Sequence, residues 1–240
     1  MKRLVLVTGA SAGIGTALAR AYAKRGFDVA LTARRTDRLE TLAQEIRDQW
    51  KVEAIVAPAD LAKLETPAAL LERIGRPVDV LVNNAGYGFE GGFADGPWQK
   101  QADFLQVMLN APTELAHRVL PGMRARGYGR ILNVASLSGL IPPGRGLYGP
   151  IKAYLVRFSV ALRGELKGTG VHVTALCPGL TYSEFHDVAG SRQSFSRIPG
   201  LFWKQAEPVA EAGVKACEKN QAIIVTGAPN KIIRQVARLF

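Results

Sequence analysis

Short apolar runs alternate with longer amphipathic stretches along almost the whole chain of 240 residues. Each run is rich in β-branched residues and bounded by turn-forming residues, which is typical of a buried strand. The expected strands are Arg3–Val7, Asp28–Thr32, Val52–Ala57, Asp79–Val82, Arg130–Val134, Val171–Leu176 and Ala222–Val225. The expected helices are Ile14–Arg25, Thr36–Gln49, Trp98–Arg126, Gly149–Lys167 and Pro208–Glu218. Because each crossover must return the chain in the same direction, this alternation predicts a parallel sheet with helices on both faces.

The size and composition indicate one domain. An α/β fold keeps a single core up to roughly 250 residues, and the 48% of hydrophobic residues can cover both faces of a sheet. We therefore expect residues 1–240 to form a single α/β domain whose ligands gather at the carboxyl ends of the strands. The pattern weakens between Val188 and Gln205, which predicts a substrate-binding loop with a short helix.

Charge, cysteine content and hydropathy exclude several classes of protein. The net charge is +11, but the basic residues are spread over many segments, which favours a solvated surface over nucleic-acid binding. Cys177 and Cys217 lie on different predicted elements, so we expect two buried thiols and no metal cluster or disulfide framework. The apolar run Leu4–Val7 stops at a glycine-rich turn, far short of a signal-peptide core, and predicts a cytoplasmic protein.

A glycine-rich segment, Thr8-Gly9-Ala10-Ser11-Ala12-Gly13-Ile14-Gly15, joins the first strand to the first helix. Glycines let the backbone approach a diphosphate closely, and a helix N-terminus offers free N–H groups and a positive dipole end. An ordinary tight turn is the alternative interpretation. The position between strand and helix favours a dinucleotide site, with candidate contacts at Gly9, Ser11, Gly13, Ile14 and Gly15.

The end of the second strand reads Leu31-Thr32-Ala33-Arg34-Arg35 and contains no carboxylate. An acidic residue there binds the ribose 2′-hydroxyl of NAD, whereas an arginine accommodates the 2′-phosphate of NADP. Two guanidiniums therefore predict NADP(H), with Arg34 as the main phosphate contact. For Arg35, a solvated position before the next helix is an equal alternative.

Lys152 lies four positions after Tyr148, which brings both side chains to one face of a helix. A free phenol has a pKa near 10 and is a poor acid–base group at neutral pH. A neighbouring ammonium would favour the phenolate and lower that pKa. The pair therefore predicts a general acid–base centre.

The chain carries three motifs in order: the glycine spacing, Asn83-Asn84-Ala85-Gly86 and the Tyr-x-x-x-Lys pair. Together they resemble the short-chain dehydrogenase/reductase family, and the resemblance extends from Leu4 to about Phe185. The resemblance implies a single Rossmann-type doubly wound parallel sheet of about seven strands. It also implies an NADP(H)-dependent oxidoreductase that transfers a hydride between the nicotinamide and a small-molecule carbonyl or alcohol.

Further cofactor contacts follow from the same resemblance. Asp60-Leu61 is similar to the pair that approaches adenine, although Asp60 could equally cap the next short helix. Asn83, Ala85 and Gly86 would lie beside the cofactor, whereas Asn84 would mainly tie strand ends together. The segment after the sixth strand resembles the Pro-Gly-x-x-x-Thr motif, which implies contacts at Pro178, Gly179, Thr181 and Ser183.

The resemblance also implies a catalytic group of four residues: Ser136, Tyr148, Lys152 and Asn110. Tyr148 would exchange a proton with the substrate oxygen, Ser136 would hydrogen-bond that oxygen, and Lys152 would also hold the nicotinamide ribose. Asn110 would support a water-linked path to the lysine. Ser138 is a rival to Ser136, but its spacing from Tyr148 is two residues shorter.

Pro150 departs from the Ser-Ala-Ser that commonly fills this interval in the family. Proline is tolerated in a helix only near its first turn. The helix that carries Tyr148 must therefore begin between Leu147 and Gly149, which places the tyrosine at its N-terminus.

Two alternatives remain open at the level of the whole protein. A catalytically idle NADP-binding sensor or scaffold would have the same fold, but the presence of Ser136, Tyr148 and Lys152 argues against it. The basic amphipathic tail Pro229–Phe240 could lie on a membrane, although packing on the same chain or a partner is favoured. The resemblance implies a homodimer or homotetramer, and the sequence does not identify the substrate.

Overall fold

The computed structural model describes residues 2–88, 92–94, 96–142, 144, 146–182 and 199–237. Seven parallel strands form one sheet in the order β3-β2-β1-β4-β5-β6-β7, which confirms the predicted fold class. The strands are β1 Leu4–Thr8, β2 Asp28–Thr32, β3 Ala54–Val56, β4 Val80–Asn83, β5 Gly129–Val134, β6 Val171–Cys177 and β7 Ile223–Val225. The order reverses between β1 and β4, so a crevice for a ligand is expected beyond their carboxyl ends.

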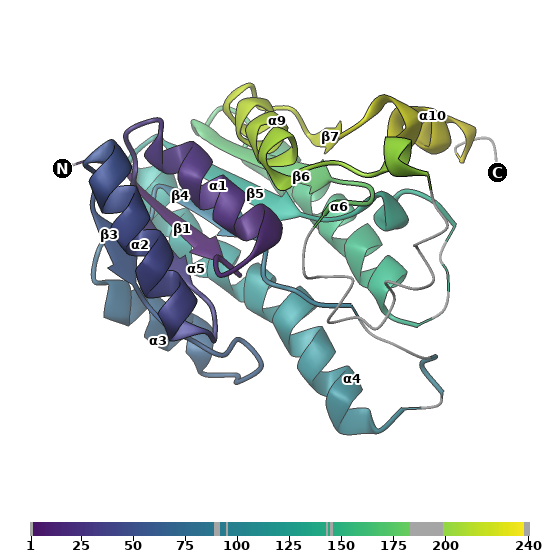
Figure 1. Ribbon diagram of the computed structural model, residues 1–240, viewed down its shortest axis with the longest axis horizontal. Coiled ribbons are helices and arrows are strands. Elements are labelled where there is room, and N and C mark those ends of the chain that lie inside the picture. Colours follow the sequence, from purple (N-terminus) through teal and green to yellow (C-terminus); the bar gives the residue numbers. More distant parts are fainter. Residues whose placement is uncertain are drawn as a thin grey trace.

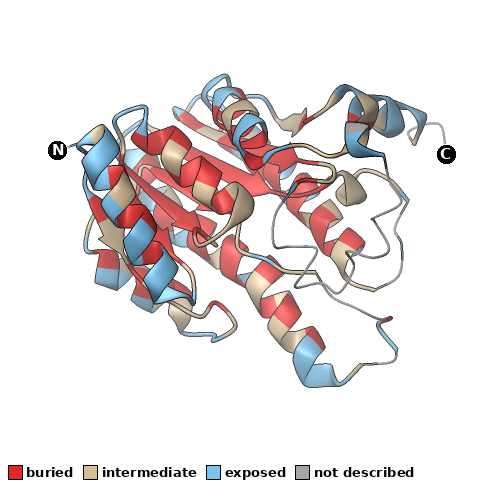
Figure 2. Cartoon of the chain, viewed as in Figure 1, coloured by how far each residue is buried: buried red, intermediate tan, exposed pale blue. Residues whose placement is uncertain are grey.

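Helices cover both faces of this sheet (Figure 1). On one face lie α1 Gly13–Ala23, α2 Thr36–Trp50 and α9 Ala206–Glu218. On the other lie α3 Thr66–Ile74, α5 Ala111–Ala125 and α6 Tyr148–Glu165. Strand β1 shows why both faces are needed: Val5 and Val7 pack toward the first set, and Leu4 and Leu6 toward the second. The buried strands between half-exposed helices follow from this arrangement (Figure 2).

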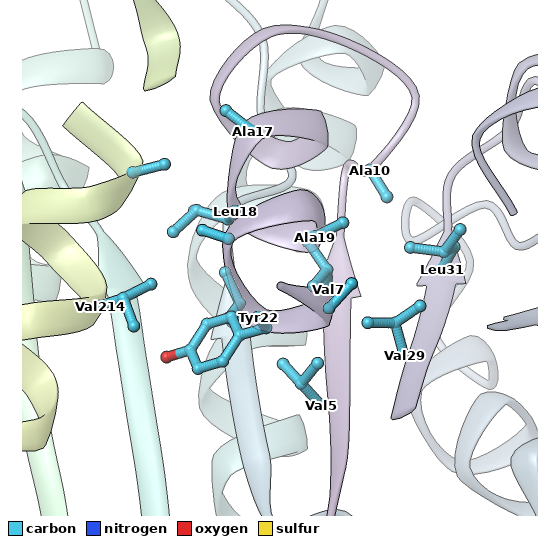
Figure 3. Close-up of a cluster of buried hydrophobic side chains, with 14 of the residues drawn as sticks. Val5, Val7, Ala10, Ala17, Leu18, Ala19, Tyr22, Val29, Leu31 and Val214 are labelled. Carbon is cyan, nitrogen blue, oxygen red and sulfur yellow. The ribbon is translucent and has the colours of Figure 1, made fainter. Parts of the chain in front are cut away.

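Helix α1 is narrow on its buried side, which lets it lie close to the sheet (Figure 3). Its alanines Ala17 and Ala19 are buried, and Leu18 and Tyr22 fill the space toward β1 and α9. Each fully buried Leu or Val stabilises the fold by roughly 1.5–3 kcal/mol relative to an exposed one. This packing fixes the N-terminus of α1 at the carboxyl edge of β1.

The predicted long helix at Trp98–Arg126 is not one continuous α-helix, so that prediction needs correction. It consists of α4 Trp98–Leu105, a π-helical turn at Gln106–Asn110, and α5. A π-helical turn inserts an extra residue into the ladder of backbone hydrogen bonds, which amphipathic spacing does not reveal, and such turns are frequent at functional sites. Helix α4 extends away from the sheet (Figure 1).

The C-terminal part of the chain contains a short 3-10 helix, Gly200–Phe202, and helix α10, Ala228–Val236. The 3-10 helix agrees with the short helix expected in the 188–205 loop, whose residues 188–198 lie outside the described ones. Within the described ranges, every helix falls short of the length and apolarity that a bilayer crossing requires.

Candidate active site

The glycine-rich segment forms a close backbone cradle at the carboxyl edge of the sheet. Gly9 and Gly13 have φ angles of +67° and +55°, which favour glycine. A Cβ atom at Gly15 would lie 2.8 Å from the carbonyl carbon of Gly9, so this turn closes only around glycine. Ala12 caps α1 without a side-chain hydrogen bond, which leaves N–H groups of the first turn for an anion.

Asn84 and Thr8 clamp this cradle to β4. The Asn84 side-chain amide donates to the Thr8 carbonyl at 2.9 Å, and the Asn84 backbone N–H donates to the Thr8 hydroxyl at 2.9 Å. The Thr8 hydroxyl in turn donates to the Val82 carbonyl at 3.1 Å. The structural role predicted for Asn84 is therefore confirmed, and Thr8 joins it in that role.

Arg34 and Arg35 are both exposed where β2 ends. The Arg35 guanidinium donates to the Ser11 hydroxyl, with Nη2 at 3.1 Å, so this arginine is attached to the glycine-rich segment. Burial raises the pKa of the Tyr87 phenol. The positive charge of Arg34 lies on the side of Tyr87 and partly offsets this rise. The two guanidiniums therefore border the same edge of the cradle.

Asp60 does not cap a helix, so that alternative was wrong. Its Oδ1 atom accepts from the Ala62 backbone N–H at 3.1 Å and stabilises a turn, whereas α3 begins only at Thr66. The intervening turn separates the aspartate from the helix. Asp60 also raises the pKa of Tyr87, which places its carboxylate on the same side as Arg34.

Ser136, Tyr148 and Lys152 come together from two elements. Ser136 follows β5, and α6 begins at Tyr148, so Pro150 occupies the first helical turn as predicted. The Ser136 hydroxyl donates to the Ser138 hydroxyl at 3.2 Å, and Ser136 lies near enough to Tyr148 to lower the pKa of its phenol. The Lys152 Nζ atom donates to the Val134 carbonyl at 2.8 Å and lies 5.6 Å from the centre of the Tyr148 ring.

The prediction that the ammonium lowers the pKa of Tyr148 is wrong for this structure. Burial raises the pKa of the phenol to about 12, and the hydrogen bond with Ser136 lowers it by less. Burial also lowers the pKa of Lys152, which is 5% exposed, to about 8. Lost hydration is the largest influence on the Tyr148 pKa, and the Lys152 Nζ atom is directed to the Val134 carbonyl.

The serine turn is held from two sides. The Leu137 backbone N–H donates to the Pro178 carbonyl at 2.8 Å, which joins the turn to the segment after β6. A Cβ atom at Gly139 would lie 2.6 Å from the Lys152 carbonyl oxygen, so glycine lets the turn contact α6. Ser138 donates its backbone N–H to the Ser136 hydroxyl at 3.1 Å and therefore orients Ser136.

Asn110 lies in the π-helical turn, and its side chain is exposed. Its amide donates to the Gln106 side chain at 3.0 Å. Met108 from the same turn packs with Ile151 and Tyr148 at the start of α6. The structure thus places Asn110 on an element that contacts the catalytic helix, while the water-linked path remains a prediction.

Asn133 and Ser159, which the sequence did not indicate as site residues, form a buried polar network with Asn83. The Asn83 amide donates to the Asn133 side chain at 2.9 Å and to the Pro112 carbonyl at 3.1 Å. Asn133 donates to the Ser159 hydroxyl at 2.8 Å, which connects β5 to α6. A polar residue within the apolar run Ile131–Val134 was the available signal. The network fixes β4, β5, α5 and α6 relative to one another.

The segment after β6 is also held in place. The hydroxyl of buried Thr181 donates to the Gly179 carbonyl at 3.1 Å, and Thr181 forms a bridge with Lys204. Ser183 lies outside the described residues. Cys177 and Cys217 are buried as predicted, and burial raises the pKa of each thiol to about 12.

Comparisons with known proteins cover nearly the whole chain. Residues 3–193 match the family model described as short chain dehydrogenase. The chain is 34% identical over 242 residues to the ketoacyl reductase HetN of Nostoc sp., covering 99% of this chain and 83% of that protein. It is 38% identical over 205 residues to the NADP-dependent 3-hydroxy acid dehydrogenase YdfG of Salmonella typhi, covering 82% and 77%.

Solved structures are similar over the same length. A short-chain dehydrogenase from Sphingobium yanoikuyae in complex with NADPH has a TM-score of 0.87 and 30% identity, covering 99% of this chain and 93% of that one. The L-sorbose reductase of Gluconobacter frateurii, complexed with NADPH and L-sorbose, has a TM-score of 0.82 and 26% identity, covering 94% and 95%.

Proposed function

Because the chain belongs to the short chain dehydrogenase family, we propose that Ser136, Tyr148 and Lys152 carry out its chemistry. The protein is an NADP(H)-dependent oxidoreductase that transfers a hydride between the nicotinamide and a substrate carbonyl or alcohol. The observation that carries the residue assignment is the position of the Lys152 Nζ atom, which lies 5.6 Å from the centre of the Tyr148 ring and donates to the Val134 carbonyl just before the serine turn.

The residues at the carboxyl edge fit NADP(H). The cradle between Gly9 and Gly15 has no room for a side chain at Gly15, so only backbone atoms line it there. It would hold the diphosphate at the N-terminus of α1. The exposed Arg34 guanidinium, with Arg35 beside Ser11, would hold the 2′-phosphate. Further contacts are assigned to Ile14, Gly13, Asp60, Leu61, Asn83, Ala85, Gly86, Pro178, Gly179, Thr181 and Ser183.

When bound, the nicotinamide supplies or accepts the hydride. Ser136 donates a hydrogen bond to the substrate oxygen and stabilises the charge that develops there. Tyr148 donates its proton to the same oxygen during reduction and accepts it during oxidation. The pKa of Tyr148, raised to about 12, keeps the phenol protonated at neutral pH, so it holds the proton that reduction transfers, but the same shift makes it a weaker acid than a free phenol.

Lys152 and Asn110 restore the proton to the phenol. With a pKa of about 8, the lysine can exchange a proton near neutral pH, and its Nζ atom also lies within the wall that would hold the nicotinamide ribose. Asn110 stands at the π-helical turn packed against the start of α6, where it supports a water-linked path to Lys152.

A screen of NADPH oxidation tests this function. Purified protein is mixed with ketones, aldehydes and β-ketoacyl thioesters, the last chosen because a relative is named a ketoacyl reductase. Oxidation of NADPH at 340 nm is expected with at least one class, and none with Tyr148→Phe as the blank. Tight NADPH binding without turnover of any substrate would instead support the idle sensor or scaffold.

We also propose that the protein is a homodimer or homotetramer built from one domain, residues 1–240. A groove between α5 and α6 supports this proposal, because Leu120, Leu162 and Leu166 line it together with the charged Arg124 and Glu165. Light scattering coupled to size exclusion would give the mass, and a 26 kDa species at micromolar concentration would contradict the oligomer.

A cytoplasmic location is proposed as well. Two free buried cysteines are consistent with a reducing compartment, although they do not require one. The exposed apolar residues of α10 leave peripheral membrane contact as the alternative. Cell fractionation distinguishes the two, because recovery in the membrane pellet would contradict the proposed location.

A further inference from the structure

Helix α10 is attached to the rest of the protein by a polar residue. Asn230 is the buried residue of this helix, with 4% exposure, whereas Ile232 and Val236 are 65% and 50% exposed. The Asn230 amide donates to the Thr226 carbonyl at 2.7 Å. An amphipathic helix usually buries its apolar face. The buried amide of α10 therefore requires another explanation than hydrophobic packing.

The Asn230 side chain lies against the backbone of Gly179. A Cβ atom at Gly179 would lie 2.7 Å from Cγ and Oδ1 of Asn230 and still closer to Nδ2. Gly179 does not have a positive φ angle, so its backbone conformation is open to alanine. The contact with Asn230 is thus what restricts this position to glycine.

The segment that contains Gly179 is held on its other sides by hydrogen bonds. Its Pro178 carbonyl accepts from the Leu137 N–H at 2.8 Å, which links it to the serine turn. Its Leu180 carbonyl accepts from the Lys204 N–H at 3.0 Å, and the Tyr182 N–H donates to the Lys204 carbonyl at 2.9 Å. Tyr182 also stacks on Trp203 at 5.0 Å. The Gly179 carbonyl accepts from the Thr181 hydroxyl within the segment, and Asn230 contacts Gly179 from outside it.

We propose that Asn230 is a positioning residue, which supports Gly179 and thereby sets the place of segment Pro178–Thr181 against the serine turn. The proposal rests on the proposed role of this segment at the nicotinamide end of the cofactor. It gives α10 a function in catalysis: the helix holds the wall on which the nicotinamide is oriented, at a distance from the adenosine end.

A compensating pair of substitutions tests the contact. Asn230→Ala removes the support, and kcat is expected to fall about tenfold, because a displacement near 1 Å can reduce a rate by up to 100-fold. Gly179→Ala drives a methyl group into the buried amide, and kcat is expected to fall further. In the double variant, the new methyl occupies the space left by the amide, so kcat should recover to about the level of Asn230→Ala alone.

The readouts separate positioning from loss of structure. Binding of 2′,5′-ADP, which occupies only the adenosine end, is expected to be unchanged in all three variants, whereas the fluorescence of bound NADPH should change with kcat. Gln235→Ala, on the exposed side of α10, is the matched control and should behave as wild type.

A double variant that is no more active than Gly179→Ala would overturn the proposal. So would an equal loss of 2′,5′-ADP binding and thermal stability in Asn230→Ala, since this would indicate a purely structural role. If wild-type protein itself fails to oxidise NADPH with any substrate, the proposed function fails, and the two failures are thus distinguishable.

Discussion

The two ends of the proposed cofactor site are built in different ways. The adenosine end depends on one continuous segment, Thr8–Gly15, together with the arginines that follow β2. The nicotinamide end brings together the turn after β5, the start of α6, the segment after β6 and a residue of α10. One end is built mainly around one short segment, which Asn84 clamps to β4, and the other is assembled from elements that are more than 90 residues apart.

The electrostatics of the nicotinamide end depend on packing more than those of the adenosine end. The adenosine cradle is specified by backbone angles and by the N-terminus of α1, and the two arginines beside it are exposed. At the nicotinamide end, Lys152 is buried and Tyr148 is half-buried, and the loss of hydration shifts their pKa values in opposite directions. Substitutions should therefore separate binding at one end from chemistry at the other.

The largest effect is expected for Tyr148→Phe, which removes the proton donor and leaves the ring in place. We expect kcat to fall by about 1,000-fold, within the range of general acid catalysis, while 2′,5′-ADP binding by calorimetry stays unchanged. Tyr154→Phe is the matched control, because Tyr154 lies on the same helix and its hydroxyl contacts only Thr113 among the described residues. A comparable loss in both variants would contradict the assignment.

The next effect concerns stability and pH at Lys152. Its folded pKa of about 8 lies below the ordinary 10.5, so between these values the unfolded chain binds more protons and folding becomes more favourable as pH rises. The free energy of unfolding of wild type, relative to Lys152→Met, should increase by roughly 2–3 kcal/mol between pH 7 and pH 10. Urea titrations of both proteins at each pH measure it, and a constant difference would mean that the ammonium is hydrated.

At the adenosine end, Arg34→Glu should reverse the cofactor preference without changing the chemistry. Loss of a charge-assisted hydrogen bond, with added repulsion, is expected to lower the ratio of kcat/KM for NADPH over NADH by about 100-fold. Steady-state kinetics with both cofactors measure this ratio. Lys219→Glu makes the same change of charge at the far end of α9 and should leave it unaltered.

The smallest effect is expected for Arg35→Ala. This guanidinium is already bonded to the Ser11 hydroxyl, so its contribution to the 2′-phosphate is shared with that contact. KM for NADPH should rise by about threefold, which corresponds to less than 1 kcal/mol. A rise as large as that for Arg34→Glu would make Arg35 the main phosphate ligand and reverse the order proposed for the two arginines.

Much of the fold followed from patterns within short stretches. All seven strands lie within a few residues of their predicted positions, because apolar runs in a doubly wound sheet are buried on both faces. Pro150 likewise located the start of α6. The π-helical turn before α5 and the turn at Asp60 were not predicted, because each is defined by hydrogen bonds to the backbone that the residue types do not specify.

The sequence by itself determined the parallel fold, the glycine cradle and the residues that meet at the reaction centre, because each depends on periodicity, backbone freedom or side-chain type. Tertiary structure alone decided the electrostatics and the supports. The pKa of Tyr148 depends on how much water packing removes, and the roles of Asn133 and Ser159, like the role proposed for Asn230, depend on contacts between elements that are distant in sequence. Burial and contact between distant elements are properties of the folded chain, so they cannot be read from the spacing of residues along the sequence.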